Sequence, residues 1–343
     1  MSNRRKRPSG RALLALGTAT AAVIATVPGS GYADPKPSIS EVRAQVAQLY
    51  EDAEKVTEEA NALGGQMKAI DRRVRKLNAD VARQQNRLDG LRGDIGQFAA
   101  SEYRTGGLDT TVQLLVADDP DEFLAQMSTA KAFAGQQGDR LRQLQGEQKR
   151  LAERQAARQA ELTRFSEAKE AANKRRKIAS GKAAKAQAIL DRLTAEERER
   201  LAAAEERERL ADRSSRGGDR IPPPPPGGTR GATALSFARQ QVGESYVFGA
   251  DGPDSWDCSG LTMVAWEQAG VSLPHSAGDQ YDVSAKISRS ELQPGDLVLF
   301  YSDMHHVALY AGDGMILHAA NPDDGVKYSD IDEMPYAGAV RPG

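Results

Sequence analysis

Cysteine is almost absent from this sequence: Cys258 is the single cysteine among 343 residues. The chain therefore cannot form an intramolecular disulfide. An excess of charge of one sign is missing too, because 46 Lys and Arg residues stand against 48 Asp and Glu residues. The near-neutral total argues against a strongly basic surface of the kind that binds nucleic acid, so we expect no nucleic-acid partner.

Long apolar runs are lacking beyond the first 33 residues, and no later segment is apolar enough to span a bilayer. The N-terminus has basic residues at positions 4–7, an apolar run over about residues 12–27, and small residues up to Ala33. This pattern is typical of a secretory signal peptide, residues 1–33, cleaved after Ala33. A membrane anchor is the alternative, but the run is shorter than the roughly 20 residues that a span needs.

We therefore expect a secreted, extracytoplasmic protein. The basic start is compatible with Sec export and, through Arg4 and Arg5, with twin-arginine export. Thiols of exported proteins usually occur in disulfide pairs. An odd cysteine is then a reactive thiol, an intermolecular link or an inert buried residue, and the neighbours of Cys258 have to distinguish these.

Residues 34–213 are predicted to form a helical coiled-coil region. Its first part repeats apolar residues at alternating steps of four and three, and a seven-residue repeat of this length predicts a left-handed coiled coil. One seam residue, Gln84, is polar, which costs stability and can fix the register. The seam positions are Val42, Val46, Leu49, Ala53, Val56, Ala60, Leu63, Met67, Ile70, Val74, Leu77, Val81, Gln84, Leu88, Leu91, Ile95 and Phe98.

A second helical stretch begins at about Asp121, and its seam is weaker because glutamine and arginine interrupt it. The short connector favours an antiparallel hairpin, with parallel dimerisation through the first stretch as the alternative. Residues 172–213 are predicted to be a solvated helical spacer, and residues 214–232, with five consecutive prolines between glycine pairs, a linker. The second seam comprises Phe123, Met127, Ala130, Ala134, Leu141, Leu144, Leu151, Leu162 and Phe165.

Residues 233–343 contain both tryptophans, all four histidines and the cysteine, so the chemistry is expected there. Helical patterns come first, over residues 234–242 and 261–268. Short β-type runs separated by glycine turns follow, over residues 297–301, 307–310, 315–319 and 340–341. Helices followed by strands predict an α+β domain with helices packed on an antiparallel sheet.

Cys258 lies immediately before an amphipathic helical pattern, in the sequence Asp-Cys-Ser-Gly-Leu. The positive end of a helix dipole and its unpaired N–H groups lower the pKa of a thiol and favour the thiolate. The same N–H groups can receive the oxyanion that forms when a thiolate attacks an amide. The position therefore indicates a nucleophilic cysteine.

A thiolate peptidase also needs a base beside the sulfur and a group that orients the base. His306 begins one predicted strand, and His318 lies in the next, after a turn at residues 312–314. Their even separation lets both face the same side of the sheet. His305 makes the choice of base ambiguous, although adjacent strand residues point to opposite faces.

The last 110 residues or so resemble the NlpC/P60 cysteine peptidases, which have a papain-like fold. The resemblance implies Cys258 as the nucleophile, His306 as the base and later the acid, and His318 as the residue that orients His306. The motifs that carry it are Asp257-Cys258-Ser259-Gly260-Leu261, Leu273-Pro274 with Gln280, Pro294-Gly295-Asp296-Leu297, His306-Val307-Ala308-Leu309-Tyr310 and His318-Ala319.

Two further site residues follow from the resemblance. Tyr246 falls where the family has a tyrosine at the oxyanion site, although a core aromatic is the plain alternative, and Ser259 is assigned with it to oxyanion or substrate binding. The sequence departs from the family at Ala250, where a glycine is frequent, and at His275, where an arginine is frequent. These differences affect the expected cleft and leave Cys258 and the two histidines in place.

The resemblance also implies a substrate, the stem peptides of peptidoglycan, cut at the bond between D-glutamate and diaminopimelate. No cofactor and no metal are expected. The order of signal peptide, coiled coil, linker and peptidase is similar to that of actinobacterial wall hydrolases used in growth and daughter-cell separation.

Two other functions remain open. The chain could be a non-catalytic regulator whose coiled coil recruits or activates other hydrolases, although a complete set of three reactive groups argues against this. The second is metal-dependent hydrolysis at a site formed by His305, His306 and His318. The sequence offers no closely spaced acidic or second cysteine ligand to complete such a site. For the coiled coil itself we expect regulation, either by docking on a membrane-bound cell-division complex or by shielding the cleft.

Overall fold

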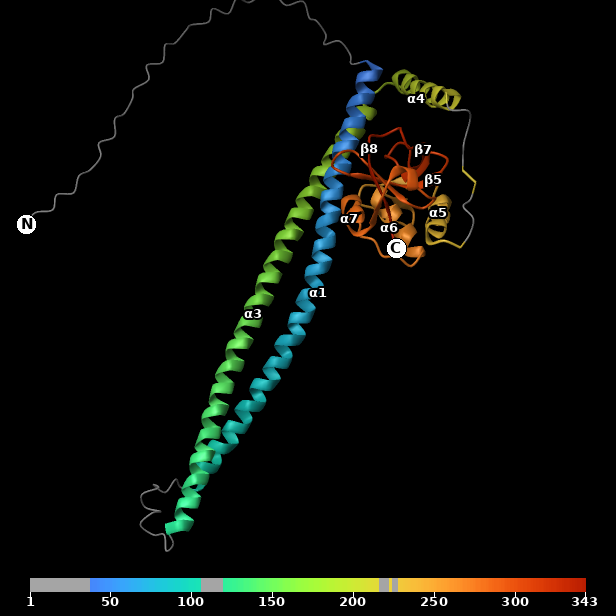
Figure 1. Cartoon of the computed structure of the whole chain (residues 1–343). Helices are drawn as coiled ribbons and strands as arrows, with labels where there is room; N and C mark the ends of the chain where they lie inside the picture. The colour runs from blue at the N-terminus through green and yellow to red at the C-terminus, as the bar shows by residue number, and fades with distance from the viewer. Residues whose placement is uncertain (1–37, 106–119, 216–221, 224–227) are drawn as a thin grey trace, which may run out of the picture. The chain divides into compact units, whose positions relative to one another are not determined.

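The protein is described from a computed structural model (Figure 1), and its contacts divide the chain into residues 1–38 and residues 39–343. The predicted signal peptide and most of the predicted linker lie outside the described residues. None of the described helices is both long and apolar enough to cross a membrane. The described residues are 38–105, 120–215, 222–223 and 228–343.

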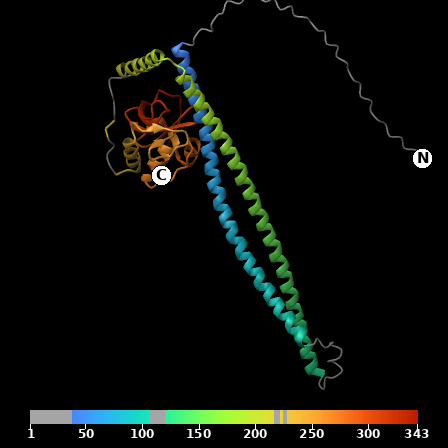
Figure 2. The same ribbon diagram turned by 180° about the vertical axis from the view of Figure 1, so that it is seen from behind.

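Two long helices, α1 (Ile39–Thr105) and α3 (Pro120–Asp191), lie side by side in both views (Figures 1 and 2). Polar pairs between them fix an antiparallel register, since rising positions on α1 meet falling positions on α3. The chain therefore has the hairpin arrangement that the short connector favours. These pairs are Asp52 with Lys182, Glu59 with Arg175, Arg73 with Glu161 and Gln84 with Glu147.

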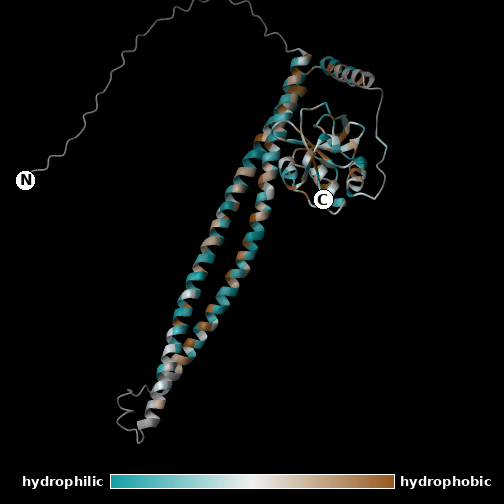
Figure 3. Cartoon of the chain, in the orientation of Figure 1, coloured by the Kyte–Doolittle hydropathy of each residue, from teal (hydrophilic) through white to brown (hydrophobic). Residues whose placement is uncertain are grey.

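The predicted seam of α1 packs against α3. All of its positions are buried or partly buried, although both helices are mostly hydrophilic on their outer surfaces (Figure 3). Gln84 lies in this seam, where its side-chain amide donates to the Glu147 carbonyl oxygen at 3.3 Å. On α3 the predicted seam is partly wrong, because Leu141 and Leu162 are exposed and Glu147 faces α1 instead. The polar pairs set a register that the interrupted apolar pattern of α3 did not reveal.

A short turn separates α3 from α4 (Ala195–Ser215). Thr194 caps α4: its hydroxyl accepts from the Glu197 N–H at 3.2 Å, and the Glu197 carboxylate accepts from the Thr194 N–H at 2.8 Å. This reciprocal pair is a capping box. Its glutamate belongs to the Glu- and Arg-rich repeat that predicted a helical spacer.

The C-terminal domain is the predicted α+β domain. Its main sheet has six strands in the order β3-β8-β4-β5-β6-β7, and all neighbouring strands are antiparallel. The elements are α5 (Arg230–Gln240), β1 (Ser245–Tyr246), β2 (Ser255–Trp256), α6 (Cys258–Gln268), α7 (Ala277–Val283), β3 (Ala285–Ile287), η1 (Arg289–Glu291), β4 (Leu297–Phe300), β5 (His306–Gly312), β6 (Met315–Ala319), β7 (Val326–Asp330) and β8 (Tyr336–Arg341).

The domain begins a few residues earlier than the predicted boundary at residue 233. Thr229 caps α5, and its hydroxyl accepts from the Ala232 N–H at 3.1 Å. Gly231 lies so close to the Pro294 turn that a Cβ would come within 2.7 Å of the Pro294 carbonyl oxygen. Residues 229–232 therefore belong to the folded domain and not to the linker.

The sequence predicted four of the six strands and missed β3 and β7. β7 has the sequence VKYSD, in which only Val326 and Ser329 are buried, so it lacks the apolar run that marks β4. The core lies where α5 and α6 cover one face of the sheet. It contains both tryptophans, Trp256 and Trp266, packed with Leu235, Leu261 and Leu309.

We expect Leu88→Ala to lower the free energy of unfolding of the helical hairpin by about 2 to 3 kcal/mol, because Leu88 is fully buried between α1 and α3. The matched control is Leu141→Ala, which shortens a half-exposed leucine of the other helix and should change it by less than about 0.5 kcal/mol. Denaturant unfolding followed by helical circular dichroism compares the two. Equal effects would contradict the described packing.

Candidate functional site

Cys258 is the first residue of α6, and Asp257 is the N-cap. The Asp257 backbone is extended, and its Oδ1 accepts from the Gly260 N–H at 2.6 Å. A side chain at residue 260 would not fit here, since a Cβ would come within 2.2 Å of the Ala250 carbonyl oxygen. The cap and the close approach at Gly260 together fix the direction in which Cys258 enters the helix.

The second oxygen of Asp257 ties this loop to the segment after β1. Oδ2 accepts from the Gly249 N–H at 3.0 Å, and the Asp257 N–H donates to the Ala250 carbonyl oxygen at 2.8 Å. Gly249 has a positive φ of 79°, a conformation that glycine adopts without strain. Asp257 therefore supports the cysteine loop.

His306 and His318 lie on the neighbouring strands β5 and β6, and the structure brings their rings together. His306 Nε2 is 2.7 Å from His318 Nδ1, and His318 Nε2 is 3.1 Å from the hydroxyl of Ser329 on β7. A ring nitrogen of His306 lies within 4.8 Å of the Cys258 sulfur. The three predicted catalytic residues thus form a continuous group from α6 across β5 to β6, with Ser329 behind it.

Burial, and then the neighbouring His306 and Lys327, hold the pKa of His318 well below its ordinary value, so His318 is neutral at physiological pH. A neutral imidazole has one donor and one acceptor nitrogen. When His318 Nδ1 accepts from His306 Nε2–H, His306 Nδ1 carries no proton and can act as a base. When His318 Nδ1 donates to His306 Nε2 instead, a neutral His306 carries its own proton on Nδ1.

His305 belongs to a different contact. Its Nδ1 pairs with Asp303, and its ring stacks on Tyr301 with the centroids 4.3 Å apart. It approaches Cys258 only through its backbone carbonyl oxygen, 3.9 Å from the sulfur. The geometry therefore places the ring of His306, and not that of His305, beside His318 and Cys258.

Tyr246 lies on β1 beside Cys258, with a buried hydroxyl that has no hydrogen-bond partner among the described residues. Burial, and then the charges of Glu54 and Cys258, raise the pKa of Tyr246 well above its usual range, so the hydroxyl keeps its proton. Ser259 also lies in the site, but its hydroxyl already donates to Glu58 at 2.6 Å. The Tyr246 hydroxyl is thus a buried donor without an acceptor among the described residues.

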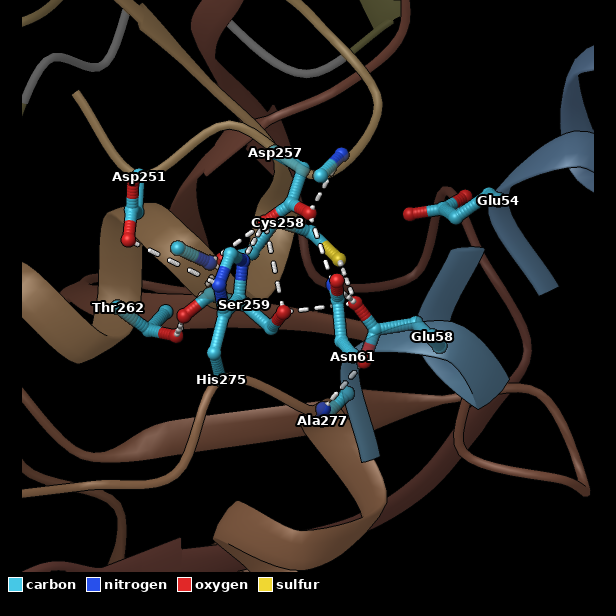
Figure 4. A network of polar contacts seen from close by, with 12 residues as sticks. Glu54, Glu58, Asn61, Asp251, Asp257, Cys258, Ser259, Thr262, His275 and Ala277 are labelled. Carbon is cyan, nitrogen blue, oxygen red and sulfur yellow. Dashed lines mark hydrogen bonds and ion pairs between the residues drawn. The ribbon is translucent and has the colours of Figure 1, made fainter. Parts of the chain in front are cut away.

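Three residues of α1 complete the site, and the sequence did not predict them (Figure 4). Glu54 Oε1 is 2.6 Å from His306 Nδ1. Glu58 Oε2 accepts from the Ala277 N–H at 2.5 Å, and its Oε1 is 3.9 Å from the Cys258 sulfur. The Asn61 amide donates to Asp257 Oδ2 at 3.0 Å.

The spacing of Glu54, Glu58 and Asn61 is the one signal that could have revealed them. Steps of four and three place them on one face of α1, apart from the seam. Nothing in the sequence distinguishes this face from a solvated one, where Glu and Asn are ordinary.

Residues 243–340 match the sequence model of the NlpC/P60 family. The matched segment contains Cys258, His306 and His318 in the arrangement described above. This segment is an NlpC/P60 domain.

The NlpC/P60 domain has similar segments in named proteins. It is 39% identical over 116 residues to a "Probable endopeptidase" of Corynebacterium glutamicum, which covers 34% of this chain and 56% of that protein. It is 44% identical over 99 residues to "Probable endopeptidase p60" of Listeria seeligeri, over 28% of this chain and 18% of the other. The crystal structure of the NlpC/p60 domain of peptidoglycan hydrolase SagA is 32% identical, with 97% of that chain and 32% of this one covered and a TM-score of 0.31.

These matches cover only part of each protein. The chain spans little more than half the length of the Corynebacterium relative and less than a fifth of the Listeria relative. The family match itself covers residues 243–340, which lie within the C-terminal domain.

The predicted lowering of the Cys258 pKa is wrong for this arrangement. Burial, followed by the charges of Glu54, Glu58 and Asp257, raises the pKa of Cys258 well above its usual range. The helix N-terminus is present, but the sequence did not reveal that two carboxylates of α1 would lie against the thiol. The thiol form is therefore favoured here.

His275, which stands where the family frequently has arginine, lies beside the same carboxylates. Its Nε2 is 3.0 Å from Asp257 Oδ1, and its Nδ1 is 4.0 Å from Asp251 Oδ2. Burial lowers the pKa of His275, but the hydrogen bond to Asp257 and the charges of Asp257, Glu58 and Asp251 outweigh it, so the net shift is upward. The upward shift favours the protonated, positively charged form of His275 beside these carboxylates.

The three-histidine metal site left open above does not form in the described part of the chain, because His305 pairs with Asp303. Another trio, Glu54, Cys258 and His306, has potential ligand atoms within 4.8 Å of one another. Glu54 and His306 are already hydrogen-bonded to each other, and the trio exists only because α1 inserts Glu54. We assign no metal to it.

Gly260→Ala should lower the free energy of unfolding of the NlpC/P60 domain by about 1 to 3 kcal/mol or more, because the added methyl would collide with the Ala250 carbonyl oxygen. Gly278→Ala is the matched control, since a Cβ at this helical position meets nothing within 4 Å. It should leave stability unchanged or raise it by up to about 1 kcal/mol. Denaturant unfolding followed by the fluorescence of Trp256 and Trp266 measures both, and similar losses would contradict the described cysteine loop.

Proposed function

We propose that the protein is a secreted peptidoglycan hydrolase, a cysteine endopeptidase that cleaves stem peptides with Cys258, His306 and His318. The observation that carries the proposal is the continuous group of these three side chains, in which the His306–His318 contact is 2.7 Å, inside a segment that belongs to the NlpC/P60 family. The names of the similar proteins, endopeptidases and a peptidoglycan hydrolase, agree with it.

The first step forms an acyl-enzyme. His306 Nδ1 takes the thiol proton of Cys258, and the thiolate attacks the carbonyl carbon of the peptide bond. The resulting oxyanion receives hydrogen bonds from N–H groups at the start of α6 and from the Tyr246 hydroxyl, which has no other acceptor among the described residues. His306 then gives the proton to the departing amine, and the C–N bond breaks.

The second step hydrolyses the acyl-enzyme. Water enters, His306 takes one of its protons, and the hydroxide oxygen attacks the thioester carbon. The C–S bond breaks, and the sulfur recovers its proton from His306. His318 remains neutral throughout and accepts from His306 Nε2–H, which leaves Nδ1 free to move the proton.

The proposed scissile bond is the one between D-glutamate and diaminopimelate. Wall peptides of this kind carry free carboxylates beside the bond. The cleft has donors suited to a carboxylate, because the Ser259 hydroxyl and the Ala277 N–H both donate to a carboxylate, that of Glu58. This agrees with a substrate-binding role for Ser259.

Localisation and biological role are parts of the same proposal. The signal-peptide pattern before Ala33 supports secretion into the cell wall. There the enzyme would remodel the wall or separate daughter cells. The helical hairpin would connect it with a membrane-bound cell-division complex.

Mass spectrometry of defined muropeptides after incubation with the full chain tests the activity and identifies the bond. We expect new fragments from the D-glutamyl–diaminopimelate bond under reducing conditions and none with Cys258→Ala, because the alanine has no nucleophile. The assay is repeated with Glu54→Ala/Glu58→Ala, which removes the two carboxylates of α1 that lie against His306 and Cys258. Absence of cleavage by every form that retains Cys258 would contradict the proposed function and favour a non-catalytic regulator.

A further inference from the structure

A cavity of about 760 Å³ lies beside the cysteine loop, and residues of α1, α3 and the segment after β1 line it. This volume is typical of sites that hold small ligands. The cavity is separate from the catalytic group, because Cys258, His306 and His318 are not among its lining residues. It borders the cysteine loop through Gly249, whose N–H donates to Asp257 Oδ2 at 3.0 Å. The cleavage steps described above make no use of this space.

One wall of the cavity is a face of α3 made of small residues. Larger side chains there would fill the space, so the cavity exists because the sequence is rich in alanine at this point. This part of α3 was predicted to be a solvated spacer, and it forms the wall of a cavity instead. The small lining residues, which follow one another at helical steps of three and four, are Ala179, Ser180, Ala183 and Ala184.

A second wall is aromatic. Tyr50 of α1 lies near Phe248, with ring centroids 6.4 Å apart, and Tyr246 meets Phe248 edge-on at 5.0 Å. The Tyr50 hydroxyl donates to Asp323 Oδ1 at 3.4 Å, and Asp323 itself is not a lining residue. Burial, and then Asp323, raise the pKa of Tyr50 to about 12, so its hydroxyl stays neutral. This uncharged wall suits the carbon skeleton of a ligand.

The charge of the lining is positive. Arg176 and Lys177 of α3 line the cavity, and no Asp or Glu is among its lining residues. The charged ends of both side chains have no hydrogen bond or ion pair to another described residue. The neighbouring Arg175 differs, because it pairs with Glu59 of α1 at 2.6 Å. The cavity therefore has two positive charges without a partner in the described part of the chain.

The neutral polar side chains of the lining are already hydrogen-bonded. Thr57 donates to the Ala53 carbonyl oxygen at 2.8 Å, Ser180 to the Lys177 carbonyl oxygen at 3.1 Å, Asn61 to Asp257 at 3.0 Å, and Gln187 to Asp191 at 3.0 Å. Among the described residues, the ends of Arg176 and Lys177 and the Tyr246 hydroxyl remain without a partner. All three are donors and two are charged, so the complementary ligand is an anion.

We propose that this cavity binds the acidic peptide that the cleavage reaction releases. The choice of this ligand rests on the proposed function. When water hydrolyses the bond after D-glutamate, its oxygen remains on the acyl carbon as part of a carboxylate, and both of its protons pass to the amine. The glutamyl residue is then the end of a peptide and has two free carboxylates.

Two carboxylates on one residue match two cations at successive positions of α3. The Arg176 guanidinium can bind one carboxylate through two parallel N–H donors, and the Lys177 ammonium can bind the other. The carbon chain of the peptide lies along the wall of Tyr50 and Phe248. The same glutamyl residue in an uncut stem peptide has only one carboxylate, so the site distinguishes product from substrate.

Product bound in this cavity affects the catalytic group through the fold. A ligand that contacts α1, α3 and the domain at once stabilises the arrangement in which they are assembled. In this arrangement Glu54 is 2.6 Å from His306 Nδ1, the nitrogen that takes the thiol proton. We therefore expect the released peptide to slow further cleavage from a position outside the catalytic group.

Isothermal titration calorimetry of the full chain with the dipeptide L-alanyl-D-glutamate tests the site. Arg176→Gln/Lys177→Gln should weaken binding about tenfold or more, because both charged contacts are lost. The control, Lys174→Gln/Lys185→Gln, removes the same charge from exposed residues of α3 that do not line the cavity. It should change the affinity by no more than about twofold, since salt screens exposed charges. No binding to the unchanged chain, or equal losses in both variants, would overturn the proposal.

A second pair of variants tests the space. Ala184→Trp fills the cavity without changing its charge and should also weaken binding about tenfold. Ala188→Trp, about one helical turn further along α3, is exposed and outside the lining, so it should bind as the unchanged protein does. Helical circular dichroism verifies that each variant is folded. A dipeptide bound in the catalytic cleft would be insensitive to both the charge and the space variants, and this result would refute the site.

Two further ligands test the charge of the occupant. L-Alanyl-D-glutamine has one carboxylate instead of two, so it should bind about tenfold more weakly. Equal affinity for the two dipeptides would contradict the proposed pairing. Inorganic phosphate tests the alternative that the cavity holds a phosphate group of a wall polymer or lipid. Tighter binding of phosphate than of the dipeptide, with the same dependence on Arg176 and Lys177, would establish that alternative in place of the product peptide.

The binding measurement needs no cleavage, so this inference and the proposed function can fail separately. If the dipeptide binds through Arg176 and Lys177 but no muropeptide is cut, the site is confirmed and the peptidase assignment is wrong. If muropeptides are cut but the dipeptide does not bind, the function stands and the site is wrong. We expect the dipeptide to slow cleavage by the unchanged chain and to slow Arg176→Gln/Lys177→Gln less. Binding without slower cleavage would contradict the effect on the catalytic group.

Discussion

The carboxylate of Asp257 caps α6, accepts from Gly249 and contacts His275, and the position of Cys258 depends on these bonds. The same carboxylate accepts from Asn61 of α1. One buried side chain thus holds the loop that contains Cys258 and also forms a hydrogen bond with α1. Burial raises the pKa of both the Cys258 thiol and Glu58, and the charge of Asp257 beside them raises each pKa further.

Much of the NlpC/P60 domain was predictable from the sequence. The glycine turn between β5 and β6 and the even separation of His306 and His318 were enough to place both rings on one side of the sheet. The strands with apolar runs were recognised, whereas β7 was missed because its partly buried positions outnumber its fully buried ones. Ser329, which lies behind His318, was missed with it.

The missing part of the site lies about 200 residues away in the sequence. In the sequence pattern, Glu54 and Glu58 cannot be distinguished from residues of a solvated helix face. The seven-residue repeat describes only the side of α1 that packs on α3. Their burial depends on a second partner, and a periodic pattern contains no information about such a partner. The prediction of a thiolate at Cys258 failed for the same reason, since a local helix dipole was weighed without distant carboxylates.

The length of α1 determines how a movement at its far end is transmitted to the site. From Glu58 to the end of the helix at Thr105 a rise of 1.5 Å per residue gives about 70 Å. A tilt of about 5° about Glu58 moves the far end of such a rod by about 6 Å, whereas a group one helical turn, about 5.4 Å, from Glu58 moves by only about 0.5 Å. The hairpin is therefore a lever, and a modest pull applied far from the sulfur is delivered to the few bonds that keep α1 seated.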